Sequence, residues 1–147
     1  MIVYFLEGKI RDYEGRYLRD IWSFDDTKIE NIHNFIQWIF PLDQISKYVP
    51  SSPVLIDEEI LEIKQSTLAK ENLILSKQWF YSFLKRTSKW ELEKNHNHAR
   101  ISRMIKSLKL LHSEDAAKKC LDEVLHLAKS RSFNAEGVLY NWKECSK

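Results

Sequence analysis

The stretch "NHNHARISRMIKSLKLLH", residues 95–112, predicts the central helix of the chain. Its apolar residues recur every three or four positions, which is the spacing of one helical face. The members of this face are Ile101, Met104, Ile105, Leu108 and Leu111. A polar column runs beside it at i, i+4, i+7 and i+11, formed by His96, Arg100, Arg103 and Ser107. We therefore expect an amphipathic helix with a donor-rich stripe next to its buried side.

The rest of the chain predicts further helices, since only three Gly and three Pro interrupt it. Residues 26–40 form one expected helix, capped by Asp25, Asp26 or Thr27 and ended by Pro41. Others are expected at 57–84, with a break near 70–72, at 113–131 and at 134–144. Residues 1–15 are expected to form a short extended segment and a turn. The sequence thus predicts an all-α fold, with residues 1–147 as a single compact domain of five to seven helices.

Composition and charge limit the class of protein. Lys and Arg exceed Asp and Glu by two, so the overall charge does not favour a nucleic-acid partner. No apolar run reaches the length of about 18 residues that crosses a bilayer, and the start "MIVYFLEGK" is too short for a signal peptide. The two cysteines, Cys120 and Cys145, are expected to stay reduced, which is typical of a cytoplasmic protein.

The stretch "NIHNFIQWIFPLD", residues 31–43, places polar groups within an apolar helix. On a helical wheel, His33 and Gln37 lie one turn apart at one edge of the apolar side. Trp38 lies beyond the opposite edge, where another element must cover it or leave it partly exposed. His33 is either a boundary histidine satisfied by Gln37 or a backbone carbonyl, or part of a pocket wall that donates to a ligand. Both hypotheses remain open at this point.

The polar column formed by His96, Arg100, Arg103 and Ser107 also allows a functional and a structural interpretation. An imidazole, two guanidiniums and a hydroxyl near a helix N-terminus favour an anion, and Arg100 could bind a carboxylate or phosphate in bidentate fashion. The alternative is that Arg100 and Arg103 pair with acids of a neighbouring helix and serve the architecture. His96 and His98 suggest a metal, but side chains two positions apart on a helix face nearly opposite directions. We expect neither a metal nor a cofactor.

Two motifs resemble the conserved region of the opioid growth factor receptor family. They are "HNFIQWIFPL", residues 33–42, and "HNHARISRMIKSL", residues 96–108. The family pattern has His, then Tyr-Ile-Gln-Trp-Leu-Phe-Pro-Leu, and later His-Asn-x-x-Arg-Ile-x-Arg-Ile-x-Lys-Ser-Leu. This chain departs from it at Phe35, where Tyr is usual, and at Lys109, where Gly often stands. The ligand-binding residues that the resemblance and the helical wheels together imply are His33, Gln37, Trp38, His96, Asn97, Arg100, Arg103 and Ser107.

The resemblance implies a receptor-like binding module for a small anionic or peptidic ligand. Animal members of the family bind an enkephalin pentapeptide and act in or near the nucleus. Two alternatives remain. The first is an enzyme that uses His33 or His96 as a general base and Arg100 to hold an anion. The second is a helical domain that binds nucleic acid through Arg100, Arg103 and the solvent-facing Lys106 and Lys109. The sequence determines neither the ligand nor the oligomeric state.

Overall fold

A computed structural model describes residues 1–147, and every regular element in it is a helix. The elements are α1 (Ile2–Leu6), α2 (Leu18–Trp22), α3 (Asp26–Asn31), α4 (Ile36–Ile39), α5 (Asp57–Gln65), α6 (Thr67–Arg86), the 3-10 helix η1 (Lys89–Glu91), α7 (His96–Leu111), α8 (Glu114–Ser130) and α9 (Glu136–Cys145). The predicted all-α class is confirmed. No helix is both long enough and apolar enough to span a membrane.

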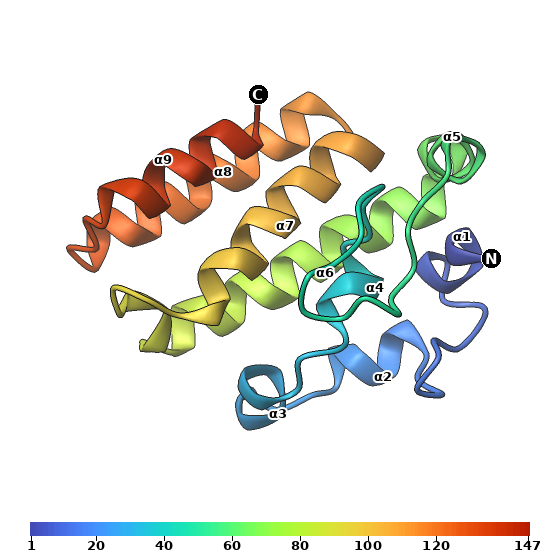
Figure 1. Ribbon diagram of the computed structural model, residues 1–147, viewed down its shortest axis with the longest axis horizontal. Helices are drawn as coiled ribbons and strands as arrows, with labels where there is room; N and C mark the ends of the chain where they lie inside the picture. Colours follow the sequence, from blue (N-terminus) through green and yellow to red (C-terminus); the bar gives the residue numbers. More distant parts are fainter.

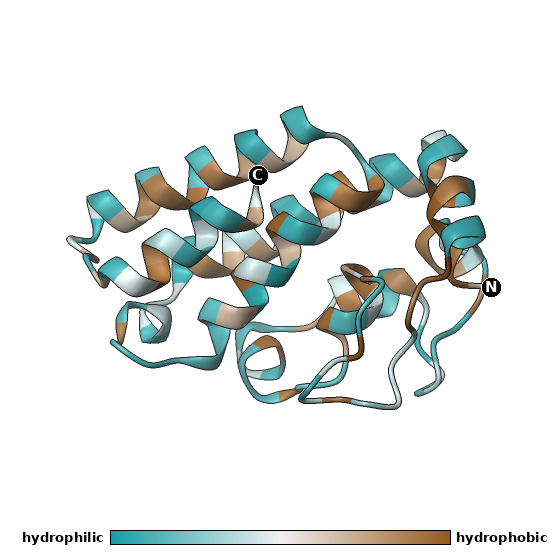
Figure 2. Ribbon diagram, turned by 45° about the horizontal axis from the view of Figure 1, so that its top comes forward, coloured by the Kyte–Doolittle hydropathy of each residue, from teal (hydrophilic) through white to brown (hydrophobic).

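Helix α7 lies at the centre of the molecule. Figure 1 shows α8 and α9 side by side on one flank of α7, with α6 behind it and the short helices α1 to α4 on the other flank. All five residues of its predicted apolar face are fully buried, and they join a hydrophobic core of 33 buried residues. Teal and brown segments alternate along the long helices in Figure 2, as expected for helices with one buried side. Burial of these faces supplies most of the favourable free energy of folding.

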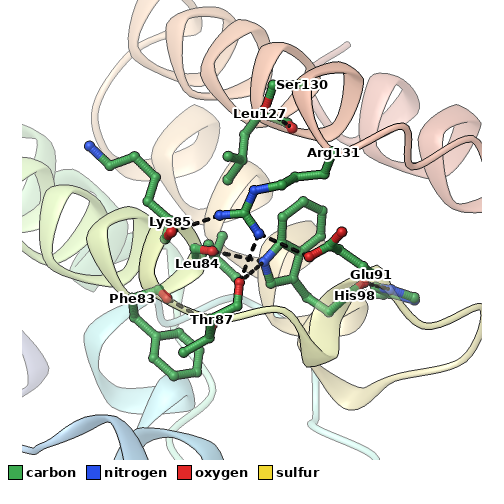
Figure 3. Close-up of polar contacts among 10 residues, drawn as sticks. Phe83, Leu84, Lys85, Thr87, Glu91, His98, Leu127, Ser130 and Arg131 are labelled. Carbon is green, nitrogen blue, oxygen red and sulfur yellow. Dashed lines mark hydrogen bonds and ion pairs between the residues drawn. The ribbon is translucent and has the colours of Figure 1, made fainter.

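The guanidinium of Arg131 joins the C-terminal ends of α6 and α8, two helices that pack against α7. Arg131, directly after α8, donates to the carbonyl oxygens of Lys85 and Thr87 at 2.7 and 3.0 Å, and to Glu91 at 2.9 Å (Figure 3). These carbonyls belong to the end of α6, where a helix has no partners of its own for them. The indole of Trp90 lies under the same guanidinium, 5.5 Å from the ring centroid to Cζ. The contacts fix α8 against α6 and η1.

The prediction of one continuous helix over residues 26–40 is wrong. Helix α3 ends at Asn31, the backbone of Ile32 is extended, and α4 begins only at Ile36. The carbonyl oxygens of Ile29 and Asn34, which a continuous helix would use internally, instead accept hydrogen bonds from arginine side chains far away in sequence. Tertiary hydrogen bonds replace the helical ones, so the local apolar pattern does not decide the conformation here.

Three further boundaries differ from the prediction. Residues 2–6, expected to be extended, are helical because Ile2, Val3, Phe5 and Leu6 all bury against the core. The break in the 57–84 region lies at Ser66 rather than near residues 70–72, because its hydroxyl caps α6 by accepting from the Ala69 N–H. The last helix starts at Glu136, two residues later than expected. These divisions give nine α-helices instead of five to seven.

We propose that residues 1–147 unfold as one unit, because helices from both ends of the chain contribute to the same buried core. Thermal unfolding followed by circular dichroism and by tryptophan fluorescence should give one shared midpoint. Chelator and reductant should leave that midpoint unchanged, since Cys120 and Cys145 are free and buried. Two separated transitions would show that the chain contains independent folding units.

Candidate functional site

The polar column of α7 lies against the segment that connects α3 to α4. Arg100 donates from its two terminal nitrogens to the carbonyl oxygens of Ile29 and Ile32, both at 2.7 Å. These groups lie at the C-terminal end of α3, where carbonyls lack helical partners. Arg100 is only 5% exposed, and this burial lowers its pKa to about 10. Both of its terminal nitrogens therefore have backbone carbonyls as partners, rather than the acids of a neighbouring helix that the architectural alternative expected.

Lower on α7, two more side chains bind the backbone that follows α4. The Nε of Arg103 donates to the carbonyl oxygen of Phe40 at 2.8 Å, and the Ser107 hydroxyl donates to that of Pro41 at 2.9 Å. Residues 40 and 41 thus lie against α7 for the same reason as residues 29–32. Arg100, Arg103 and Ser107 of the predicted polar column thus donate hydrogen bonds to backbone carbonyls at the end of α3 and directly after α4.

A buried carboxylate stands beside the first turn of α7. Glu30 accepts from the side-chain amide of Asn97 at 2.9 Å and pairs with the Nε2 of His96 at 2.9 Å. The Asn97 oxygen in turn accepts from Arg100 at 3.2 Å. Glu30 thus partly compensates the buried charge of Arg100, because it lies close enough to oppose the lowering of that arginine's pKa. Asn97 is completely buried in this network.

His33 and His96 meet where the two motifs approach each other. Their ring centroids lie 4.9 Å apart, edge to face. Desolvation lowers the pKa of His33, and the charges of Arg100 and His96 lower it further. His98 points elsewhere and pairs with the carbonyl oxygen of Trp90 at 2.6 Å. No group of three or more His, Cys, Asp or Glu side chains is arranged to hold a metal ion.

A pocket of about 490 Å³ opens beside these histidines, a volume within the range of small-molecule sites. Its walls come from α4 and α7, from the segment before α4, from the loop between α4 and α5, and from Asn141 of α9. The lining residues from the two motifs are His33, Ile36, Gln37, Leu42, His96, Ala99, Arg100, Ser102, Arg103 and Lys106, and the others are Gln44, Ile45, Ser46, Lys47, Tyr48 and Asn141. The lining contains four Lys or Arg residues and no Asp or Glu, so the pocket favours an anion.

Arg103 differs from Arg100 in having a buried terminal nitrogen without a hydrogen-bond partner. This nitrogen is Nη2, and no carboxylate lies near enough to pair with it. Burial alone lowers its pKa to about 10, so it remains charged at neutral pH. A buried charge without a partner is costly, and an anion from outside would relieve that cost.

The structure brings five of the eight predicted site residues to this pocket, namely His33, Gln37, His96, Arg100 and Arg103. Asn97 and Ser107 are completely buried and bond to Glu30 and Pro41, so they do not line it. Trp38 is 6% exposed and packs between Phe5 and Tyr13, at centroid distances of 5.2 and 4.7 Å. Other elements therefore cover Trp38, as its position on the helical wheel required, and it does not line the pocket.

Sequence reasoning missed the contribution of the loop after Pro41. Lys47 and Tyr48 line the pocket, and Tyr48 is 77% exposed. Neither belongs to a periodic pattern, so a helical wheel could not place them. The length of the loop was a usable signal, because long connections without secondary structure in compact proteins are often functional. Lys106, assigned to the solvent side of α7, is exposed and also lines the pocket.

Helices α4 and α7 and the loop after α4 therefore form a cation-lined pocket, and most of its lining comes from two sequence motifs. The model of the opioid growth factor receptor (OGFr) conserved region matches residues 11–127, and this chain belongs to that family. It is 28% identical over 137 aligned residues to opioid growth factor receptor-like protein 1 of Mus musculus, and equally to that of Rattus norvegicus. Each alignment covers 78% of this chain and 29% of the relative. No solved structure matches the chain.

Replacing Arg100 should lower stability more than replacing an exposed cation of the same helix. Arg100→Met leaves the carbonyls of Ile29 and Ile32 without partners, at a cost on the order of 2–3 kcal/mol in the free energy of unfolding. Lys106→Met, one to two turns further on, should change it by less than about 0.5 kcal/mol. Urea unfolding of both variants gives the comparison. Equal midpoints would mean that Arg100 does not hold α3 in place.

The titration of His33 should occur below the ordinary histidine range. Because its folded pKa is lowered from 6.5, the stability it contributes is present above pH 6.5 and is lost as the pH falls through the folded pKa. Proton NMR should place the His33 titration below pH 6.5. His33→Asn should reduce the loss of melting temperature between pH 7 and 5, whereas His126→Asn, at an exposed position, should not. A His33 pKa at or above 6.5 would contradict the described packing.

Proposed function

We propose that this protein is a binding module that holds a small anionic or peptidic ligand in the pocket between the 33–42 and 96–108 motifs. The observation that carries the proposal is the unpaired, buried Nη2 of Arg103 in a pocket lined by basic and uncharged residues only. The whole chain has a net charge of just +2, so this concentration of positive charge is local. An anion there gains from several cations and displaces no carboxylate.

Arg103 rather than Arg100 is the residue that we assign to the anion. Arg100 already donates from both terminal nitrogens, and Glu30 partly compensates its charge. Arg103 uses its Nε on Phe40 and keeps a terminal nitrogen free. Lys47 and Lys106 at the pocket wall would add attraction that salt screens. Arg100 therefore shapes the site, and Arg103 meets the ligand.

The pocket also has apolar walls, which favour a ligand larger than an inorganic ion. Ile36 and Leu42 are buried at its lining, while Ile45 is 71% exposed on the loop. Apolar walls that carry a few polar groups are typical of small-ligand sites. The receptor name of the rodent relatives agrees with a binding role, although this chain spans only 29% of their length. A receptor role for this chain is thus part of the proposal.

The direct test is the binding of sulfate at constant ionic strength, because sulfate keeps its charge between pH 5 and 9. Calorimetric titration should show one site, and Arg103→Met should weaken it at least about tenfold through loss of a charge-assisted hydrogen bond. Lys109→Met is the matched control, since it removes a cation of α7 that does not line the pocket. It should bind like the original protein.

Two results would contradict the proposed function. One is unchanged sulfate affinity in a folded Arg103→Met variant. The other is equal loss in both variants, which would indicate a diffuse electrostatic effect of α7 rather than a site. The folded state of each variant is checked by circular dichroism before titration.

A further inference from the structure

Two buried side-chain atoms have no hydrogen-bond partner, and both belong to residues of the same pocket. They are the Nη2 of Arg103 and the Oε1 of Gln37, each exposing less than 1 Å². One is a charged donor and the other is a neutral acceptor. Gln37 as a whole is only 3% exposed. Buried polar atoms without partners are rare in proteins, and two at one pocket indicate a ligand with two complementary groups.

The orientation of the Gln37 amide is determined by its own contact. Its Nε2 donates to the backbone carbonyl oxygen of His33 at 3.4 Å. Rotating the amide by half a turn would place Oε1 against that carbonyl oxygen, and two acceptors repel each other. Oε1 therefore remains the group in need of a partner, and that partner must be a donor. A sulfate or a simple carboxylate offers no donor, so the anion of the proposed function satisfies only half of the site.

We infer that the pocket recognises an N-acylated amino acid, free or as the carboxyl-terminal residue of a peptide. This inference rests on the proposed function and names its ligand class. The carboxylate would bind Nη2 of Arg103, and the amide N–H of the same residue would donate to Oε1 of Gln37. These ligand groups are joined through a single carbon, so one residue presents both. Its side chain would lie against the apolar wall formed by Ile36 and Ile45.

Access to the two atoms requires only side-chain motion. Each atom exposes less than 1 Å², and both residues line the pocket together with Gln44, Lys47 and Tyr48 of the loop after α4. Rotation of the terminal torsions of Arg103 and Gln37 would turn Nη2 and Oε1 toward the ligand, and Gln37 would then give up its long contact with the His33 carbonyl oxygen. The motion is favoured because each atom leaves an unpaired state, which costs free energy, for a hydrogen bond with the ligand.

Three related compounds separate the two contacts. N-acetyl-L-leucinate carries both groups, 2-acetoxy-4-methylpentanoate replaces its N–H by oxygen, and N-acetyl-L-leucinamide replaces its carboxylate by a neutral amide. In NMR shift titrations of the full chain, the first should bind, the second about tenfold more weakly, and the third not measurably. A missing hydrogen bond that leaves a buried acceptor unpaired corresponds to a factor of this size.

Gln37→Leu tests whether the preference for N-acetyl-L-leucinate over its oxygen analogue depends on Oε1 of Gln37. It should bind N-acetyl-L-leucinate and its oxygen analogue with equal affinity, because the acceptor is gone. Gln44→Leu is the matched control, since Gln44 lines the same pocket but is exposed. That variant should keep the tenfold preference. If Gln37→Leu does not fold, the comparison of the three compounds on the original protein still tests the proposal.

The inference and the proposed function fail in different ways. Sulfate binding that depends on Arg103, together with equal affinity for N-acetyl-L-leucinate and its oxygen analogue, would overturn the ligand class and leave the anion site standing. Sulfate binding without any binding of N-acetyl-L-leucinate would do the same. Absence of binding by sulfate and by all three compounds would overturn both.

Discussion

Arg100 closes the end of helix α3, and the position of the neighbouring segments depends on this contact. Its guanidinium binds the carbonyls of Ile29 and Ile32, so the chain leaves the helical path and restarts as α4 four residues later. Arg16, which precedes α2, binds the side-chain and backbone oxygens of Asn34. Two arginines from different parts of the chain thus hold the break. Without it, a continuous helix would carry Gln37 and Phe40 away from α7.

The polar column of α7 holds neighbouring segments in place through hydrogen bonds, and one of its donors has no partner. His96, Arg100 and Ser107 use their donors on Glu30, on α3 and on Pro41. Arg103 uses one nitrogen on Phe40 and retains Nη2. We propose that the ligand site lies where this network, which otherwise holds the fold together, leaves Nη2 of Arg103 without a partner.

Helices that follow from apolar periodicity could be predicted from the sequence. Helix ends that depend on contacts with residues far away in the chain could not. The apolar face of α7 and the helix expected at 113–131 follow from local rules, and the structure has both, the second as α8. The break at Ile32 could not be predicted, because residues 26–40 keep a helical pattern and the arginine that ends it lies about seventy positions away. The helical wheel likewise placed Arg100 and Arg103 in one column, but only the contacts distinguish their roles. Lys47 and Tyr48 lie in an irregular loop that carries no periodic signal.

The central claim is that Arg103 holds the anion while Arg100 holds the fold. The most direct measurement is a titration of sulfate followed through the side-chain Nε–H resonances of individual arginines in nitrogen-15 NMR spectra. We expect a saturable shift at Arg103 with a much smaller one at Arg100, and none at Arg131, which lies outside the pocket. Equal shifts at all arginines, or a saturable shift confined to Arg100 or Arg131, would contradict this claim.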